Sequence, residues 1–483
     1  MHNIFGREKE KNKLAALLKS NEPQFLALYG RRRTGKTYLI RNFFKGQNIY
    51  FEMTGSKRAS TKEQLFNFKH AFKDAFSSFS KPINPKNWTE ALFLLWEAIK
   101  EVSKKNKKII LFFDEVPWIA TKRSNFLPAL EHLWNRYLSN QKNVILIICG
   151  SAASWIIDKV IDNRGGLYGR LTEVIHLHPF NLLETENFLQ SLGIKWDRQQ
   201  IVDLYLAFGG VAKYLTFVKR GWSAAQAIQN QIVDCNGLMH REFDRLFESL
   251  FDHDERHRKV VQLLASKRKG FPQKSLIKKT GLSSGGNSYH IIKELEQSGF
   301  LTYIPRFGDK KYGGDYRLTD EYSLFYLYWI NTLKNRSLMY GQKDYWMQMQ
   351  NSKSWLSWSG YAFETVCLKH ISQIKKALGI NGVITYQTGW RSSTNSKGAE
   401  IDLLIERADG CINLCEIKFS RGLFTITKSY AESLKRKKLK FIEETNTNKA
   451  IFITLITPHG VKENNHFHFE VDKQLMLDDL FSQ

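Results

Sequence analysis

The sequence has few cysteines and no long apolar run, and both scarcities narrow the class of protein. Five cysteines are scattered over 483 residues, which does not indicate a disulfide framework and favours a reducing compartment. Cys411 and Cys415 are the closest pair, but no second Cys or His pair lies nearby to complete a zinc site. No window approaches the apolar length needed to span a bilayer, and the first residues lack the apolar region of a signal peptide. We therefore expect a cytoplasmic protein.

Acidic residues are scarce relative to basic ones. The chain has 47 Asp and Glu against 72 Lys and Arg, a formal net charge of +25. Such an excess favours a polyanionic partner, either nucleic acid or an acidic membrane surface. No amphipathic anchor supports the membrane alternative, although a generally basic proteome would produce the same excess. The length indicates three or four domains.

The most specific motif lies near the N-terminus and reads G-x-x-x-x-G-K-T. An apolar run at residues 25–29 precedes it and a helical pattern at 38–44 follows, which is the strand–loop–helix context of a phosphate-binding P-loop. Glycines allow backbone N–H groups to close around phosphate oxygens, and the helix N-terminus favours the anion. Lys36 is expected to reach the β- and γ-phosphates of ATP, and Thr37 to hold Mg²⁺. The predicted nucleotide contacts are Gly30, Arg31, Arg32, Arg33, Thr34, Gly35, Lys36 and Thr37.

A second apolar run, Ile109–Phe113, ends in two acids, Asp114 and Glu115. A buried parallel strand would carry both acids to the edge of the sheet where the P-loop binds phosphate. We expect Asp114 to bind Mg²⁺ through its water shell. We expect Glu115 to orient and deprotonate the attacking water.

Two further residues follow the third apolar run, and each has two interpretations. Ser151 comes directly after residues 144–150, where a hydroxyl can lie near the γ-phosphate or can cap the next helix. Arg170 follows a glycine-containing loop at residues 165–169. It can stabilise charge on the transferring phosphate, within its own subunit or across a homo-oligomer interface, or it can be an ordinary loop arginine.

At this point residues 1 to about 240 resemble the archaeal-type P-loop ATPase family, a relative of the AAA+ and STAND ATPases. Ile4–Glu8 resembles the family's N-terminal box, which implies adenine contacts at Gly6 and Arg7. Ser151 matches the sensor 1 position, and the segment ending at Arg170 resembles the loop of the proposed arginine finger. Residues 209–215 resemble a helical-lid motif that usually has Pro where this chain has Ala212. The resemblance implies an ATPase core at 1–175 and a helical lid at 176–245.

Residues 250–335 have the pattern of a winged helix-turn-helix, with three helical segments followed by a β-hairpin. The third helix, about Gly286–Ser298, would enter the major groove of double-stranded DNA. The residues expected to contact nucleic acid are Asn287, Tyr289, His290 and Lys293 from that helix and Lys310 and Lys311 from the turn, with phosphate contacts also at Lys274, Lys278, Lys279 and Arg306. A winged helix used only for packing or protein contact is the alternative.

The C-terminal region contains two β-type runs separated by a turn with Asp409 and Gly410. A two-residue turn would place Asp402 and Glu416 on opposite faces. A three-residue turn with Gly410 left-handed pairs Asp402 with Glu416, so that both acids and Lys418 share a face. We predict the three-residue turn. Two converging carboxylates can hold Mg²⁺ or Mn²⁺, and the lysine can polarise a phosphate.

This D…E-x-K pattern, preceded by Glu364 on a helix, resembles the PD-(D/E)xK restriction-endonuclease-like superfamily over residues 355–470. Ile401 stands where that family often has Pro. The resemblance implies a nuclease-like domain at 350–483, with Asp402, Glu416 and Glu364 at a metal and Lys418 as the site lysine. A cross-strand salt-bridge ladder is the alternative.

The expected fold class is therefore α/β: a P-loop parallel sheet with a helical lid, then a winged helix and a smaller mixed nuclease-like domain. The favoured function is Mg²⁺-dependent ATP hydrolysis coupled to binding or processing of DNA. The alternative is a nucleotide-gated switch or scaffold whose nuclease-like domain is inactive.

Overall fold

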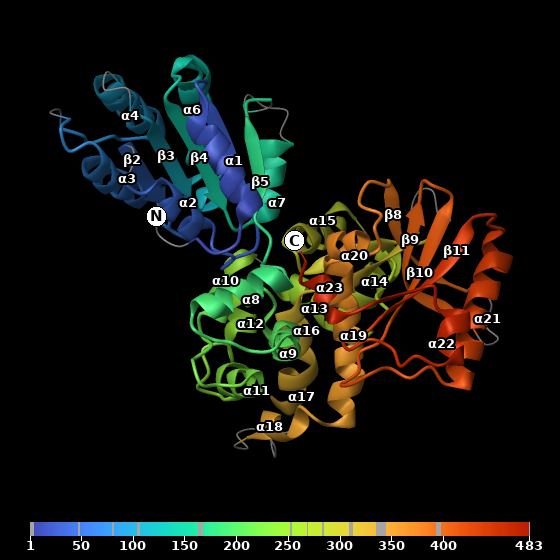
Figure 1. Cartoon of the computed structure of the whole chain (residues 1–483). Coiled ribbons are helices and arrows are strands. Elements are labelled where there is room, and N and C mark those ends of the chain that lie inside the picture. Colours follow the sequence, from blue (N-terminus) through green and yellow to red (C-terminus); the bar gives the residue numbers. More distant parts are fainter. Residues whose placement is uncertain are drawn as a thin grey trace. The chain divides into compact units, whose positions relative to one another are not determined.

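The computed structural model divides into two units, residues 1–179 and 180–483. It describes residues 4–46, 49–79, 82–103, 107–162, 167, 169–251, 254–267, 269–282, 285–308, 313–334, 344–392 and 398–482. The segments predicted as winged helix and nuclease-like domain belong to the second unit, as does the predicted lid from residue 180 onward. Figure 1 colours the chain along its sequence and labels the elements used below.

The first unit is built on a parallel five-stranded sheet in the order β2-β3-β4-β1-β5. Its strands are rich in β-branched and aromatic residues, and β3 and β4 are buried throughout, which suits strands covered on both faces. The strand bounds are β1 Gln24–Tyr29, β2 Ile49–Thr54, β3 Ile109–Asp114, β4 Val144–Gly150 and β5 Glu173–His176.

Helices cover both faces of this sheet. Successive strand residues point to opposite sides, so Phe25 packs with one set of helices and Leu26 with the other. The helices on the Leu26 side are α1 Glu8–Lys19 and α2 Lys36–Phe44; those on the Phe25 side are α3 Thr61–Ala75, α4 Trp88–Ser103 and α6 Phe126–Arg136 (Figure 1). Two short helices, α5 Val116–Ile119 and α7 Ala153–Ile156, follow β3 and β4. The sheet and its two helical layers are the α/β architecture that the sequence predicted.

The second unit begins with helices joined by short, capped turns. Asn181 and Ser223 each form a capping box with the third residue of the helix that they begin. The bounds are α8 Leu182–Ser191, α9 Arg198–Phe208, α10 Ala212–Leu215, α11 Ala224–Ile228 and α12 Glu242–Leu250. Three helices and an antiparallel hairpin follow: α13 Asp254–Ser266, α14 Gln273–Thr280, α15 Gly286–Gln297, β6 Leu301–Pro305 and β7 Gly314–Leu318.

A second five-stranded sheet lies further along, in the order β12-β11-β10-β9-β8. Strands β8, β9 and β10 are antiparallel, whereas β10, β11 and β12 are parallel, so the sheet is mixed. Its strands are β8 Thr385–Arg391, β9 Glu400–Arg407, β10 Cys411–Ile417, β11 Ala450–Ile456 and β12 Lys473–Leu475. The remaining helices are α16 Glu321–Phe325, α17 Asn331–Lys334, α18 Tyr345–Met349, α19 Lys353–Lys369, α20 Ile371–Ala377, α21 Lys428–Thr445, α22 Asn465–Glu470 and α23 Leu477–Leu480.

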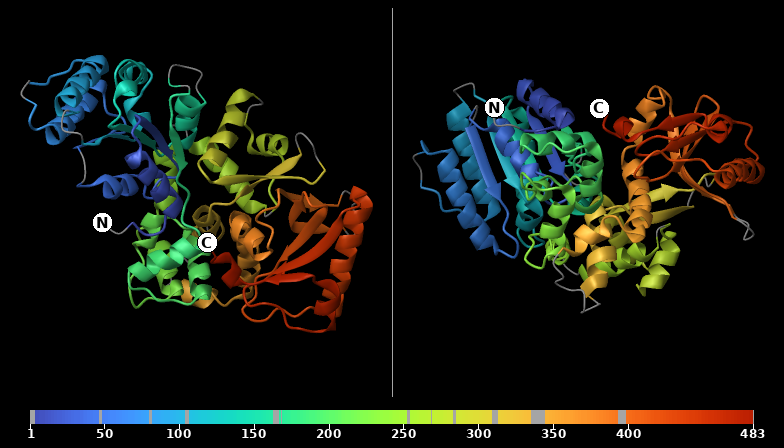
Figure 2. Two further views of the ribbon diagram at one scale, coloured as in Figure 1. Left: turned by 45° about the horizontal axis from the view of Figure 1, so that its top comes forward. Right: turned by 60° about the horizontal axis from the view of Figure 1, so that its bottom comes forward.

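The predicted three-residue turn between β9 and β10 is present. Leu403 pairs with Cys415, so one step further along the ladder sets Asp402 opposite Glu416. Gly410 has φ 79°, in the left-handed region as predicted. Helix α21 packs on one face of this sheet through Phe441, and Figure 2 shows this helix, in red, along the strands.

One hydrophobic core extends through the whole second unit. It includes Leu189 near the start of the unit, Leu264 from α13, Ile405 from β9 and Phe481 near the end of the chain. The aromatic residues Tyr345, Trp346, Trp355 and Trp358 are buried in this unit. Residues from all three predicted segments therefore contribute to this core, and smaller separate clusters form around Phe441 and Leu455.

Candidate functional site

The P-loop connects β1 to α2 at the carboxyl edge of the parallel sheet. Gly30 has φ 145°, and a Cβ there would lie 2.3 Å from the carbonyl oxygen of Leu177, so only glycine fits. Lys36 Nζ donates hydrogen bonds to the carbonyl oxygens of Gly30 and Arg31, at 2.8 and 2.9 Å. The loop is thus closed around the ammonium group that was predicted to meet the phosphates.

The two predicted Mg²⁺ ligands are in direct contact. Thr37 Oγ1, at the start of α2, donates a hydrogen bond of 2.6 Å to Asp114 Oδ2 at the end of β3. Asp114 is buried. A hydroxyl and a carboxylate side by side beside a phosphate-binding loop are the oxygen donors that Mg²⁺ uses in nucleotide sites. The residues present therefore fit a Mg²⁺-nucleotide complex.

The predicted water-activating acid contacts the predicted sensor. Ser151 Oγ and the Ser151 backbone N–H both donate to Glu115 Oε2, at 2.8 and 3.2 Å. Ala152, not Ser151, occupies the N-cap position of α7, so the capping alternative does not apply. Glu115 has φ 49°, a left-handed conformation that is uncommon for a residue with a side chain. This conformation occurs where β3 turns into α5, at the edge that holds the P-loop.

Arg7, which the N-terminal box predicted as a nucleotide contact, lies against the P-loop. It directly precedes α1 and is almost fully buried. Its Nη2 donates to the carbonyl oxygen of Thr34 at 3.3 Å. Gly6 precedes it with φ 62°. Arg7 is therefore in contact with the loop.

The C-terminal acids and lysine also converge. Lys418 Nζ lies 3.5 Å from both Asp402 Oδ2 and Glu416 Oε2. The backbone N–H of Ile417 donates to Asp402 Oδ2 at 3.0 Å, and Lys437 Nζ donates to Glu416 Oε1 at 2.6 Å. We call Glu364, Asp402, Glu416 and Lys418 the acid–lysine site.

The electrostatics of the acid–lysine site reflect crowded acids. Burial and the Asp402 carboxylate raise the pKa of Glu416, while Lys437 and Lys418 oppose the shift. Burial and Asp402 also raise the pKa of Glu364 to about 8, with Arg317 opposing. Burial lowers the pKa of Lys418, whereas the Asp402 carboxylate raises it; together the surroundings raise the pKa above its ordinary value. Repulsion among the acids is thus balanced by nearby cations.

The three acids do not form a complete metal cage. Among the residues that the structure describes, no group of three or more His, Cys, Asp or Glu side chains is arranged to hold a metal ion. The prediction that Glu364 joins Asp402 and Glu416 as a third ligand is therefore not met in this arrangement. Lys437 hydrogen-bonds to Glu416 Oε1, whereas the buried Oε2 lies 3.5 Å from Lys418 Nζ and accepts no hydrogen bond from the described residues.

The family model of an ATPase domain predominantly from Archaea matches residues 4–218. This part of the chain, less than half of its length, is similar to the ATPase domain of that family. The chain is 27% identical over 261 residues to an uncharacterized protein of Methanocaldococcus jannaschii, covering 54% of this chain and 53% of that protein. It thus spans about half the length of that relative. It is 26% identical over 244 residues to an uncharacterized ATP-binding protein of Pyrococcus abyssi, covering 44% of this chain and 71% of the relative.

A solved structure, the Walker-type ATPase of Pyrococcus abyssi, aligns with 67% of this chain and 96% of its own. The TM-score is 0.49 and the sequence identity 19%. This similarity carries no functional conclusion for this chain.

Arg170 and Ala212 belong to two further segments that resemble motifs of the ATPase family. Arg170 is exposed, and its backbone N–H donates to the carbonyl oxygen of Leu167 at 3.1 Å; Tyr168 in the same loop lies outside the described residues. Ala212, in the lid motif, is the first residue of α10. Pro is favoured at the first position of a helix. Gly210, two residues earlier in the same motif, packs so closely that a Cβ on it would lie 1.8 Å from the Phe180 carbonyl oxygen.

The predicted nucleic-acid face of α15 points to solvent. Tyr289, His290 and Lys293 are exposed, whereas Ile291 and Ile292 are buried. His290 Nε2 lies 3.5 Å from Glu294 Oε1. The side chain of Asn287, and the whole of Lys310 and Lys311, lie outside the described residues.

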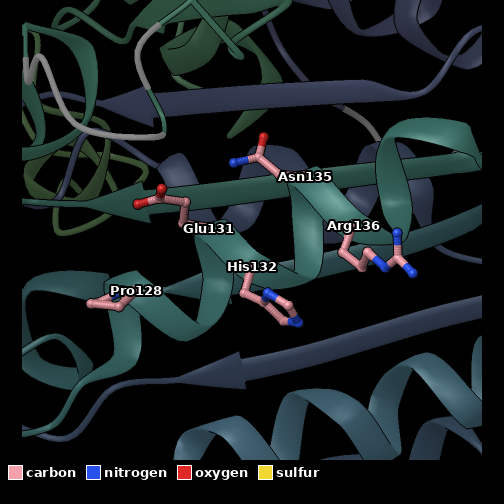
Figure 3. A pocket seen from close by; sticks show the side chains of 5 residues that line it. All are labelled: Pro128, Glu131, His132, Asn135 and Arg136. Carbon is pink, nitrogen blue, oxygen red and sulfur yellow. The ribbon is translucent and has the colours of Figure 1, made fainter.

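A separate open pocket of about 360 Å³ lies on α6. Figure 3 shows its lining side chains, all from this helix: Pro128, Glu131, His132, Asn135 and Arg136. It contains no residue of the P-loop and neither acid of β3, so it is distinct from the nucleotide site.

Sequence reasoning missed two cations of the acid–lysine site. Lys437, on α21, contacts Glu416. Arg317 lies in strand β7 of the hairpin, and its Nη1 lies 4.0 Å from Glu364 Oε2. Lys437 and Phe441 are four residues apart, so helical spacing places them on the same face of α21, and the sequence could have indicated that this lysine faces the sheet. No sequence pattern indicates that Arg317 lies near Glu364.

Among the described residues, no helix combines the length and the apolar character needed to cross a bilayer.

Proposed function

We propose that this protein is a cytoplasmic ATPase whose nucleotide state controls binding or processing of double-stranded DNA. The observation that carries the ATPase part is the convergence at one sheet edge of Lys36 in its closed loop, the Thr37–Asp114 contact and the Ser151–Glu115 contact. These contacts join three strand ends that are distant in sequence.

Each residue then has a role that its position supports. Lys36 exchanges the carbonyls of Gly30 and Arg31 for phosphate oxygens. Thr37 and Asp114 hold Mg²⁺, which neutralises charge on the phosphates. Glu115 accepts a proton from the water that attacks the terminal phosphate, and Ser151 holds the carboxylate in place.

The DNA part rests on net charge and on the exposed face of α15. The charge of +25 favours a polyanion. Tyr289, His290 and Lys293 offer a stacking ring, hydrogen bonds and a cation on one exposed helix face. We assign α13, α14, α15 and the β6–β7 hairpin to a winged helix that presents this face to a DNA groove.

ATP turnover measured with and without double-stranded DNA tests the proposal. We expect Mg²⁺-dependent hydrolysis that DNA stimulates. Glu115→Gln is expected to bind ATP without turning it over, and Lys36→Ala is expected to lose binding. Glu131→Gln on α6 is the matched control and keeps wild-type turnover. Unchanged turnover in both site variants would refute the ATPase assignment, and turnover indifferent to DNA would refute the coupling.

The acid–lysine site supports two candidate roles. Paired Asp402 and Glu416 with Lys418 resemble a metal-dependent nuclease centre in which the two acids hold Mg²⁺ or Mn²⁺. The alternative is a nuclease-like domain that does not cleave, within a nucleotide-gated switch. The hydrogen bond from Lys437 to Glu416 Oε1 supports it, because that oxygen is already engaged.

Cleavage of plasmid DNA with Mg²⁺ or Mn²⁺ distinguishes the two roles. A nuclease shows metal-dependent nicking that Asp402→Ala and Glu416→Ala abolish. A switch shows no nicking with either metal in the presence of ATP.

A further inference from the structure

Arg317, on β7, is a buried guanidinium beside the acid–lysine site. The residue is 8% exposed, and its Nη1 lies 4.0 Å from Glu364 Oε2, beyond hydrogen-bond distance. Among the described residues, none accepts a hydrogen bond from its buried Nε. A buried charged donor without an acceptor is unfavourable unless a ligand completes it.

Arg306, the other arginine of the hairpin, is a guanidinium with hydrogen-bond acceptors and serves as a comparison for Arg317. Arg306 Nη2 donates to both carboxylate oxygens of Asp315, at 3.0 and 3.1 Å, and its Nε donates to the same group at 3.3 Å. Arg306 is exposed and pairs fully, whereas Arg317 is buried and does not. A purely structural ion pair would be expected to resemble the first arrangement.

The hairpin is fixed to the sheet that holds the acids. Phe307 N–H donates to the carbonyl oxygen of Gly389 at 3.0 Å, at an irregularity in edge strand β8. The ring of Phe307 also lies 5.0 Å from that of Phe441 on α21. Arg317 is therefore held at the acid–lysine site by backbone and aromatic contacts that do not depend on its own charge.

Two more cationic side chains, Lys269 and Arg391, lie near Arg317 and the acid–lysine site. Lys269, in the turn between α13 and α14, pairs with Glu400, and Arg391 Nη2 lies 3.2 Å from another oxygen of that carboxylate. Burial lowers the pKa of Arg391, and the neighbouring Arg317 and Arg306 add to this direction while Asp315 opposes it. Crowded cations of this kind repel one another, and an anion placed among them relieves the repulsion.

We propose that Arg317 is an anion-binding residue of the acid–lysine site, where it holds a backbone phosphate of bound nucleic acid. The winged-helix hairpin thus completes a site whose other residues belong to the C-terminal sheet. Its planar donors suit the paired oxygens of a phosphodiester. The inference rests on the proposed nucleic-acid binding but needs no cleavage.

Binding of fluorescently labelled double-stranded DNA to the full chain tests it, with Ca²⁺ as the divalent ion and salt varied. Arg317→Gln is expected to weaken binding roughly ten- to hundredfold, the value of a charge-assisted hydrogen bond. The slope of log affinity against log salt should fall by about one, as for one lost phosphate contact. Arg317→Lys should keep the salt slope and still bind more weakly, because an ammonium group lacks the planar pair of donors that a guanidinium offers to two phosphate oxygens.

Arg407→Gln is the matched control, because Arg407 lies at the far end of β9 and pairs with Asp409. It is expected to bind like the wild type. Arg317→Gln with the affinity and slope of the control would overturn the inference. Thermal unfolding shows whether Arg317→Gln folds; if it does not, wild-type affinity in Arg317→Lys overturns the inference. A wild-type chain that binds no DNA is a different result, which refutes the proposed function itself.

Discussion

Ser151 and Glu115 end neighbouring strands, and their contact makes the serine a positioning residue for the carboxylate. The hydroxyl contributes one of two donors to Glu115 Oε2. The residue types were readable from the sequence, since an apolar run followed by acids marks a strand end. The contact was not, because it depends on the order of β3 and β4 in the sheet.

Ser151→Ala should therefore lower the rate of ATP turnover roughly tenfold, a fraction of the effect of a general base, without changing ATP affinity. The backbone N–H still holds Glu115, which limits the loss. Turnover and nucleotide binding measured separately check this. Ser139→Ala, whose hydroxyl bonds to Asn135 O in the same unit, is the control. A loss of ATP affinity in Ser151→Ala would contradict the assigned role.

His370 provides a prediction about pH. It is buried between two segments of the second unit, where Nδ1 bonds to Val366 O at 2.7 Å and Nε2 accepts from Leu182 N–H at 3.0 Å. Burial lowers its pKa to about 4, although the Val366 carbonyl and Glu321 oppose this. The folded state thus binds this proton less readily than the unfolded state, so stability is full above pH 6.5 and falls as pH drops towards 4.

The expected loss is about 2 kcal/mol between pH 7 and pH 5. Urea unfolding of the full chain at both pH values measures it. His370→Gln should be less stable at pH 7 but should lose less on acidification, whereas the exposed His290→Gln should lose as much as the wild type. Equal pH dependence in His370→Gln would contradict the assignment.

At the scale of elements, the β9–β10 hairpin was the most predictable part of the second unit. Its register follows from the turn at Gly410, because a turn of three residues needs a left-handed residue at that point. The docking of β6 beside β8 could not be predicted, since it uses backbone groups and carries no residue signature. For the same reason Arg317 was not recognised as a neighbour of Glu364.

Gly410→Ala should destabilise this hairpin by about 1 kcal/mol, because the left-handed conformation is strained for a residue with a Cβ. The turn is open enough that no clash adds to this cost. Chemical unfolding of the two proteins measures the difference. Gly422→Ala, also in open space but without a positive φ, should cost less. An equal cost for both substitutions would argue against the turn conformation.

At the scale of the whole molecule, the two units have separate cores. Leu189, Leu264, Ile405 and Phe481 share one core, although the sequence divides this region into three patterns. Local sequence patterns indicate which residues are buried but not which buried residues contact one another. The helices and strands were therefore easier to predict than the grouping of these segments into domains. The ATPase sheet was more predictable, because its strands carry both motif and burial signals.

Two cores predict two thermal transitions in calorimetry of the full chain. ATP with Mg²⁺ at a hundred times its dissociation constant should stabilise only the first unit, by about 2.7 kcal/mol. Lys36→Ala should remove this shift and leave the other transition unchanged. A single transition that ATP shifts as a whole would show that the two units unfold together.

The hydrogen bonds of Lys36 to Gly30 and Arg31 have a consequence for selectivity. A ligand must offer anionic oxygens to draw the ammonium group away from two good acceptors. Adenosine offers none and AMP offers only one phosphoryl group, so neither compensates for opening the loop. The loop should therefore select nucleotides by the length of their phosphate chain, independently of any contact with the base.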